Sequence, residues 1–214
     1  MLNLPKAILF DWDGTVIDSM GKVQACMQQA SDFMGLPPIT AEHAIEAAIH
    51  GSKAGKVIYN LDDKANHQYW QLFSERYFKF TGDCTLTKGV GELIAALPTS
   101  IPLGVVTNMR RDLFDDQLAH LGWRDGFTAS VCVDEAPRNK PAPDPALMAL
   151  EIMRIKPSRE VWFIGDTRGD IECANAAGLT SILLASGQPT CNPHYAFAHC
   201  GEIHAQLSGI LQIA

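Results

Sequence analysis

The sequence predicts a doubly wound α/β protein, and three observations support that fold class. Short and almost wholly apolar runs recur along the chain, as is typical of strands buried on both faces of a parallel sheet. Helical patterns separate these runs, and such an alternation builds a parallel sheet with helices on both faces. With 214 residues, 47% of them hydrophobic, the chain is also long enough to bury a sizeable core.

The predicted elements follow one another in the order that such a sheet requires. The apolar runs predicted as strands are 7–10 (AILF), 103–107 (LGVVT), 161–165 (VWFIG), 180–185 (TSILLA) and, more weakly, 129–133 (ASVCV). The helices predicted between them are 110–122, 144–155 and 169–178. The first of these helices ends at Gly122, a residue type that commonly follows a helix C-terminus. A last strand near 195–199 and a closing helix from about 202 complete the predicted chain.

Residues 15–84 interrupt the alternation. They contain no convincing strand, and they show helical patterns at 18–34, 41–50, 53–60 and 64–79. The aromatic residues of the last helix recur at helical spacing, which favours core packing over a cofactor site. We therefore expect residues 1–14 and 85–214 to form the sheet domain and residues 15–84 to form an inserted all-helical domain. An insert after the first strand would lie near the carboxyl ends of the strands, where ligands bind in open α/β sheets.

Composition excludes several classes of partner. The net charge is −7 and the pI is about 5.4, whereas a general nucleic-acid binder usually presents a basic face. The first residues, MLNLPK, lack the apolar segment of a signal peptide, and no apolar run reaches the length of a membrane span. Without an export signal, the six scattered cysteines indicate reduced thiols. We therefore expect a cytoplasmic protein with no nucleic-acid or membrane partner.

Two carboxylates, Asp11 and Asp13, directly follow the first predicted strand in the segment AILFDWDGT. Like charges this close repel each other, and desolvating them costs free energy. Carboxylates at such a position can bind Mg²⁺, attack phosphorus or transfer a proton to a leaving group. A strand-terminal turn closed by Gly14 is the alternative explanation of this segment taken alone.

Three further motifs supply what a phosphoryl site requires. Thr107 and Asn108 end the second long strand, where a hydroxyl and backbone N–H groups can bind phosphate oxygens. Lys140 precedes two prolines in NKPAPD, which restrict the backbone around this cation. Asp166 and Asp170 lie in FIGDTRGD, after another strand. Each motif alone could be a turn, a helix cap or an exposed lysine, but all are predicted at one edge of one sheet.

The set DWDGT, TN, KPAPD and GDTRGD, in this order and with a helical insert after the first motif, resembles the haloacid dehalogenase-like superfamily. Within it, the chain is similar to the phosphatase branch with a helical cap, which includes phosphoglycolate phosphatase and β-phosphoglucomutase. The resemblance spans nearly the whole chain. It implies a Rossmann-like core and a cap that acts as a lid. It also implies Mg²⁺-dependent hydrolysis of a small phosphorylated metabolite through an aspartyl-phosphate. We expect the protein to be a monomer or a homodimer.

The resemblance implies a role for each motif residue. Asp11 would be the nucleophile, and Asp13 would protonate the leaving alcohol and later activate water. Thr107 and the Asn108 backbone would bind the oxygens of the transferring phosphoryl group. Lys140 would pair with the phosphate and with Asp11.

The resemblance also implies a magnesium site. Its ligands would be the Asp11 carboxylate, the Asp13 backbone carbonyl and Asp166, while Asp170 would bind or orient the metal shell. The chemistry of these residues agrees, because an anionic nucleophile that approaches an anionic phosphate needs cations to cancel the repulsion. Mg²⁺ and Lys140 would provide that positive charge.

Two alternatives remain open, a sugar phosphomutase of the same family and a catalytically silent binding or regulatory protein on this fold. The mutase needs the same residues. The silent protein is disfavoured because Asp11, Asp13, Lys140 and Asp166 are all present. Asp13 also separates the chain from dehalogenases, because a halide leaves without a proton.

Two segments outside the four motifs also carry candidate functional residues. A short helix after Gly51 resembles the substrate-specificity loop of these enzymes, so Gly51 and Lys53 are expected to contact substrate. An exposed helix-start residue is the alternative for Lys53. The C-terminal segment contains Cys191, His194, His199, Cys200 and His204. Their spacing fits no standard zinc site, and a closing strand and helix are the favoured explanation.

Overall fold

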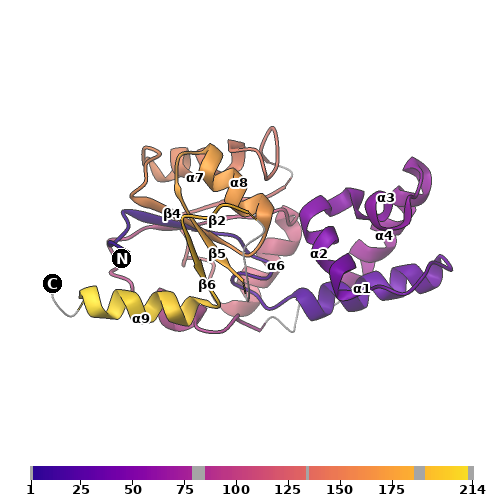
Figure 1. Ribbon diagram of the computed structural model, residues 1–214, viewed down its shortest axis with the longest axis horizontal. Coiled ribbons are helices and arrows are strands. Elements are labelled where there is room, and N and C mark those ends of the chain that lie inside the picture. Colours follow the sequence, from indigo (N-terminus) through magenta and orange to yellow (C-terminus); the bar gives the residue numbers. More distant parts are fainter. Residues whose placement is uncertain (1, 79–84, 134, 186–190, 212–214) are drawn as a thin grey trace. The chain divides into compact units, whose positions relative to one another are not determined.

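The computed structural model describes residues 2–78, 85–133, 135–185 and 191–211, and the chain divides into two units. The first unit comprises Met1–Asp18 and Thr85–Ala214, and the second comprises Ser19–Cys84. The first contains the sheet, whereas the described part of the second contains helices and turns (Figure 1). The sheet unit thus includes residues 15–18, which the sequence analysis assigned to the helical insert.

A six-stranded parallel sheet with the order β3-β2-β1-β4-β5-β6 forms the centre of the first unit. Its strands are β1 (Ala7–Phe10), β2 (Leu103–Val106), β3 (Ala129–Val131), β4 (Val161–Gly165), β5 (Thr180–Leu184) and β6 (Tyr195–Phe197). The order reverses between β1 and β4, which is the switch point where open α/β sheets bind ligands. The predicted fold class and all six predicted strands are confirmed.

The strand register brings the ends of three strands to one level. Phe10, the last residue of β1, pairs with Val105 of β2 and Ile164 of β4. The residues that follow these strands therefore leave the sheet at the same edge. That edge is the carboxyl edge on which the sequence motifs were expected.

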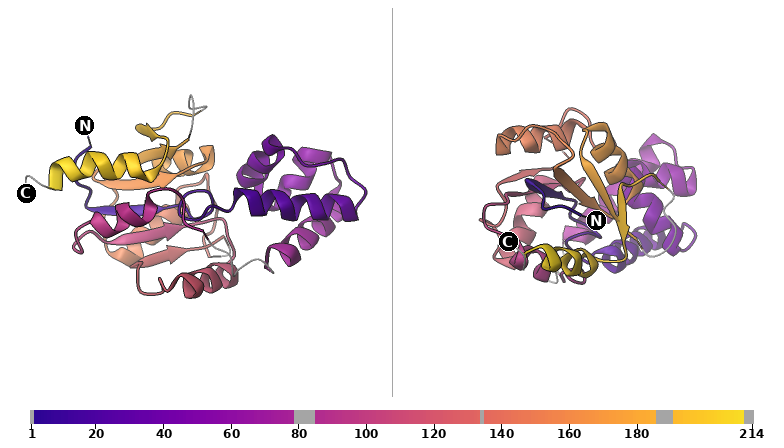
Figure 2. Two further views of the ribbon diagram at one scale, coloured as in Figure 1. Left: turned by 90° about the horizontal axis from the view of Figure 1, so that it is seen from below. Right: turned by 60° about the vertical axis from the view of Figure 1, so that its left-hand side comes forward.

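Helices cover both faces of the sheet. They are α5 (Val90–Ala96), α6 (Arg111–Leu121), α7 (Asp144–Met153), α8 (Arg168–Ala176) and α9 (Cys200–Leu211). Figures 1 and 2 show α7 and α8 on one face, and α5, α6 and α9 on the other. On the α7–α8 face, Leu9, Phe163 and Leu150 share one buried hydrophobic cluster. Burial of this apolar surface is the main contribution that stabilises such a layer.

Helix α5 was not predicted from the sequence. It spans seven residues, which are too few for a helical periodicity to be recognised. It begins after Gly89, whose φ of +81° lies in the left-handed region. A Cβ atom on Gly89 would overlap the backbone of Gly201, at the start of α9. The glycine therefore permits the close packing of α5 and α9.

The helical unit contains the four helices expected from the pattern. They are α1 (Met20–Phe33), α2 (Ala41–His50), α3 (Ala54–Tyr59) and α4 (Asp63–Phe78), with a 3₁₀ turn, η1 (Gly51–Lys53), before α3. Tyr69, Phe73 and Tyr77 of α4 are buried, as expected for core packing. The Ser31 hydroxyl of α1 lies 2.8 Å from the Tyr59 hydroxyl and 3.5 Å from that of Tyr69. These contacts join three helices of the unit.

Among the described residues, no helix is both long enough and apolar enough to cross a membrane. The cysteines that the structure describes, Cys26, Cys132, Cys173, Cys191 and Cys200, are free thiols. The sixth, Cys84, lies outside the described residues.

Candidate active site

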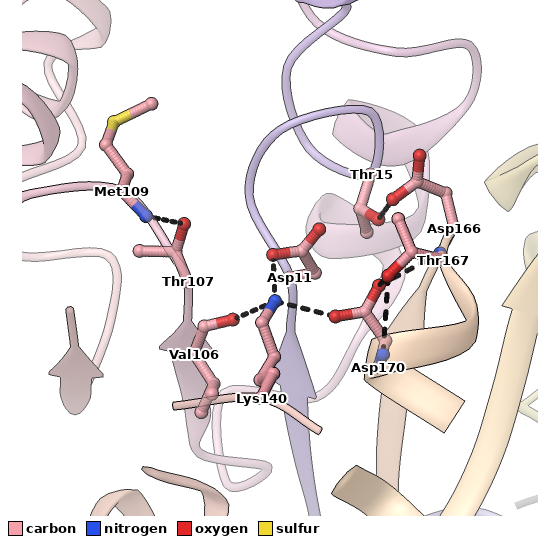
Figure 3. Close-up of polar contacts among 9 residues, drawn as sticks. All are labelled: Asp11, Thr15, Val106, Thr107, Met109, Lys140, Asp166, Thr167 and Asp170. Carbon is pink, nitrogen blue, oxygen red and sulfur yellow. Dashed lines mark hydrogen bonds and ion pairs between the residues drawn. The ribbon is translucent and has the colours of Figure 1, made fainter. Parts of the chain in front are cut away.

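A buried lysine lies among carboxylates at the carboxyl edge of the sheet (Figure 3). The Lys140 Nζ atom donates to Asp11 Oδ1 at 2.5 Å, to Asp170 Oδ1 at 2.6 Å and to the Val106 carbonyl at 3.1 Å. An ammonium has three N–H donors, so this environment satisfies all of them. Lys140 is 8% exposed, Asp11 is 5% exposed and Asp170 is fully buried. The expected pairing of Lys140 with Asp11 is therefore present in the structure.

The charges in this cluster do not balance. Burial, and then the negative charge of Asp170, raise the pKa of Asp11 to about 7, although Lys140 acts in the opposite direction. The pKa of Asp166 is raised well above its usual range, first by desolvation of the Asp166 carboxylate and then by repulsion from Asp11 and Asp170. Burial lowers the pKa of Lys140, but Asp11 and Asp170 outweigh that effect and raise it. Lys140 therefore stays charged, whereas Asp11 and Asp166 tend to keep a proton, because the three carboxylates, if all ionised, would carry more negative charge than Lys140 compensates.

The carboxylates are close enough to share a cation. Asp11, Asp166 and Asp170 each offer an oxygen within 4.8 Å of the others. Two of them, Asp11 and Asp166, lie at the ends of adjacent strands. Hard carboxylate oxygens are the ligands that Mg²⁺ prefers, and a divalent cation would offset the excess negative charge. The donor set therefore fits the predicted magnesium site.

Both carboxylate oxygens of Asp170 already accept hydrogen bonds from the protein. Its Oδ1 atom accepts from Lys140, and its Oδ2 atom accepts from the Thr167 backbone N–H at 2.9 Å and from the Thr167 hydroxyl at 2.6 Å. Thr167 is the N-cap of α8, and the two residues form a capping box. Sequence reasoning missed Thr167, although the spacing in TRGD fits a capping box with Asp at its fourth position.

The DWDGT segment forms a tight turn that reaches Asp166. The Trp12 carbonyl accepts hydrogen bonds from the backbone N–H groups of Thr15, Val16 and Ile17, at 3.3, 2.8 and 2.9 Å respectively. The Thr15 hydroxyl donates to Asp166 Oδ1 at 3.2 Å. This turn therefore connects the end of β1 to the carboxylate that follows β4. Sequence reasoning gave Thr15 no such role.

Gly14 allows the close approach of the two segments. Its φ is +78°, and a Cβ atom at this position would overlap the Asp166 carboxylate. The turn that the sequence analysis held as an alternative to a functional site is therefore present, and it adjoins the carboxylate cluster. Asp13, in the same turn, is partly exposed.

Thr107 and Asn108 follow β2 at the same edge. Thr107 is buried, its backbone N–H donates to the Val131 carbonyl at 3.0 Å, and its hydroxyl oxygen accepts from the Met109 N–H at 3.0 Å. This arrangement makes a compact turn at the end of the strand (Figure 3). The hydroxyl hydrogen of Thr107 remains a possible donor to an anion. Asn108 is partly buried.

The two other predicted substrate contacts belong to the helical unit. Gly51 and Lys53 form η1 there, and Lys53 is exposed. The buried Asn66 of α4 supports this turn, because its side chain donates to the Ser52 carbonyl at 2.8 Å and accepts from the Lys56 N–H at 3.0 Å.

The cysteines and histidines of the C-terminal segment have other surroundings. The His194 ring lies 2.7 Å from the Ser181 hydroxyl, and burial raises the pKa of the Cys200 thiol to about 12. Within the part of the chain that the structure describes, the group of possible metal ligands consists of the three aspartates.

Residues 8–184 match the family of haloacid dehalogenase-like hydrolases. The chain belongs to this family. The matched region runs from β1 to β5 and contains all four motifs identified in the sequence.

Among its relatives, this haloacid dehalogenase-like hydrolase is similar to two phosphatases. It is 32% identical over 206 residues to the N-acetylmuramic acid 6-phosphate phosphatase of Pseudomonas aeruginosa, covering 92% of this chain and 88% of the relative. It is 31% identical over 193 residues to the phosphoglycolate phosphatase of Neisseria meningitidis, covering 85% of this chain and 81% of the relative. A crystal structure from Lactobacillus plantarum matches with a TM-score of 0.83 at 23% identity, over 94% of this chain and 98% of the other. At that identity, the structural likeness shows the fold alone.

Proposed function

We propose that this hydrolase is a Mg²⁺-dependent phosphatase that cleaves a small phosphomonoester through an aspartyl-phosphate. The family and the named relatives support a phosphoric monoester hydrolase. The observation that supports the finer mechanism is the placement of Asp11. Its carboxylate is buried at the end of β1, accepts a hydrogen bond from Lys140 and lies beside Asp166. A carboxylate in such a position can act as a nucleophile next to cationic groups that stabilise a phosphoryl group.

The proposed reaction has two steps. The Asp11 carboxylate attacks phosphorus, the P–O ester bond breaks, and Asp13 gives its proton to the departing alkoxide. Asp13 then takes a proton from a water molecule, whose oxygen attacks the aspartyl-phosphate. The second attack breaks the bond between phosphorus and Asp11, and it releases inorganic phosphate. Lys140 remains charged throughout and offsets the negative charge of Asp11 and of the phosphoryl oxygens.

Magnesium would be bound by the carboxylates of Asp11 and Asp166 and by the backbone carbonyl of Asp13. When bound, it would supply positive charge to the phosphoryl oxygens. We assign Asp170 to holding Lys140, because its oxygens already accept hydrogen bonds from Lys140 and Thr167. The Thr107 hydroxyl and the Asn108 backbone N–H are proposed to bind the phosphoryl oxygens.

We further propose that the substrate carries a carboxylate as well as its phosphate. The two named relatives act on phosphoglycolate and on N-acetylmuramic acid 6-phosphate, which are both phosphorylated acids. The helical unit is proposed to act as a cap that selects the leaving group, with Gly51 and Lys53 of η1 as contacts. The ammonium of the exposed Lys53 suits a carboxylate.

A phosphate-release screen tests the proposed function. The purified protein is incubated with phosphoglycolate, N-acetylmuramic acid 6-phosphate, hexose phosphates and nucleoside monophosphates, with and without Mg²⁺. Faster release from phosphorylated acids, only in the presence of Mg²⁺, is the expected result. Asp11→Asn is the matched control and should release no phosphate. Absence of release from every ester would overturn the proposal.

A further inference from the structure

We propose that Gln117 positions the Asp11–Asp13 segment through a buried hydrogen bond to Trp12. The Trp12 Nε1 atom donates to Gln117 Oε1 at 2.6 Å, between two residues 105 positions apart in the chain. Trp12 is 0% exposed and Gln117 is 3% exposed. The inference rests on the proposed function, because it gives Gln117 a positioning role in that reaction.

Gln117 is a polar residue on the buried face of α6. Its neighbours on that face, Leu113, Phe114 and Leu118, are hydrophobic and buried. An amide in such a place costs free energy unless it is hydrogen-bonded, and a buried indole N–H likewise needs an acceptor. The indole N–H of Trp12 supplies the donor that the buried Gln117 amide oxygen needs, and the amide oxygen supplies the acceptor that the indole N–H needs.

The ring of Trp12 is held by aromatic contacts as well as by this hydrogen bond. Phe114 meets it edge to face, with ring centroids 4.8 Å apart and planes at 80°. Phe127 lies 6.0 Å away with its plane at 78°. These contacts confine the ring, while the directional bond to Gln117 selects one orientation of the indole.

Trp12 connects this anchored ring to the active site in two directions. On one side, it directly follows Asp11, the carboxylate that binds Lys140. On the other, its carbonyl accepts the Thr15 N–H, and the Thr15 hydroxyl donates to Asp166. A shift of Trp12 would therefore move the proposed nucleophile and a proposed metal ligand together. A misplacement of about 1 Å can lower the rate of an enzyme by roughly 100-fold.

A double-mutant cycle tests this coupling. Gln117→Met removes the acceptor at similar length, Trp12→Phe removes the donor, and the double variant removes both. We measure kcat and KM for p-nitrophenyl phosphate and for an alkyl phosphate at saturating Mg²⁺. Gln117→Met alone should lower kcat by about 10- to 100-fold while KM changes little, because the unpaired indole N–H displaces Trp12.

In the Trp12→Phe background, Gln117→Met should lower kcat by less than about threefold, because no buried donor remains unpaired. Leu150→Val, in α7 on the opposite face of the sheet, is the matched control. It should lower the urea midpoint and leave kcat unchanged.

Two outcomes would overturn the inference. An equal loss of kcat in both backgrounds would mean that Gln117 does not act through Trp12. An unchanged kcat in Gln117→Met, with only a lower urea midpoint, would reduce the hydrogen bond to a structural role. In both outcomes the wild-type enzyme is active. A wild-type protein without phosphatase activity would instead overturn the proposed function, and the positioning role with it.

Discussion

Lys140 and Asp170 form a buried ion pair, with Nζ and Oδ1 2.6 Å apart. The second oxygen of Asp170 accepts from Thr167, at the start of α8. The pair therefore ties the lysine, which enters from the loop before α7, to the helix that follows β4. Removing one partner of such a pair leaves an uncompensated buried charge. We expect this arrangement to keep Lys140 in place beside Asp11.

Asp170→Asn should therefore act through Lys140. The variant loses a negative charge, and one of the two side-chain oxygens that accept from Lys140 and from Thr167 becomes an NH₂ donor. We therefore expect kcat to fall by about 10- to 100-fold. The Mg²⁺ concentration needed for half-maximal activity should rise far more in Asp166→Asn than in Asp170→Asn. Titration of both variants with Mg²⁺ gives the comparison. An equal rise in the two would assign Asp170 to the metal instead.

Removal of divalent cations should abolish activity, and Mg²⁺ should restore it. Because a bound cation offsets the repulsion among the three carboxylates, Mg²⁺ should also stabilise the fold. The free energy of unfolding should rise by about 2.7 kcal/mol at 100 times the dissociation constant. Ca²⁺ should inhibit, since its looser coordination would misplace Asp11. Urea unfolding in the presence of EDTA, Mg²⁺ or Ca²⁺ measures the change in the free energy of unfolding. Asp166→Asn is the control, and Mg²⁺ should not stabilise this variant. Full activity in excess EDTA would contradict the prediction.

Asp13→Asn should reveal the proton transfer. With ordinary alkyl phosphates, we expect a loss of about 100- to 10,000-fold in kcat. The loss should be smaller for p-nitrophenyl phosphate, because its leaving group needs less protonation. The ratio of the two rates is the measurement. Equal losses for both esters would indicate a defect in folding or metal binding.

His194 should make stability depend on pH. Its Nδ1 atom accepts the Ser181 backbone N–H at 3.1 Å, which requires that this nitrogen carry no proton. Burial, and then the charge of Arg159, lower the pKa of His194 below its ordinary value of 6.5. Between that lowered value and about 6.5, the unfolded state binds more protons than the folded state, so stability falls as the pH falls. Above about 6.5, both states are neutral and this contribution is constant.

Urea midpoints of the wild type and of His194→Asn, measured between pH 5 and pH 8, separate this effect from other titrations. The variant keeps an oxygen acceptor near Ser181 but cannot titrate in this range. Its midpoint should fall less than that of the wild type on acidification below about pH 6.5. Parallel curves for the two proteins would show that His194 is not the group responsible.

Lys53→Ala should change substrate preference. If the helical unit selects the leaving group, the variant should lose rate with phosphorylated acids while hydrolysis of acetyl phosphate stays nearly unchanged. Lys64→Ala, at an exposed position of α4, removes the same charge elsewhere in the unit and is the control. Relative kcat/KM values over the substrate panel give the answer. A uniform loss that includes acetyl phosphate would refute this role, and an unchanged preference would place selectivity on other residues.

Local sequence patterns were sufficient to predict the fold class and the position of each motif along the chain. The buried strands read as continuous apolar runs, and the carboxyl ends of parallel strands share one edge, so Asp11, Thr107 and Asp166 could be grouped without coordinates. The match to the hydrolase family confirmed the family that the four motifs indicated. Local patterns were sufficient because each strand and its following polar residues are adjacent in the chain.

The contacts between side chains at the site depend instead on how distant segments pack in the folded chain. Lys140 contacts Asp170 across 30 residues, and Trp12 contacts Gln117 across 105, and no periodicity predicts either pairing. Thr15 reaches Asp166 only because β1 and β4 are neighbours in the sheet order and Gly14 leaves room. Such contacts depend on strand order and on side-chain packing between distant segments, which are collective properties of the folded core. Local sequence therefore places the chemistry at the sheet edge, and long-range packing determines which partner each charged or polar group has there.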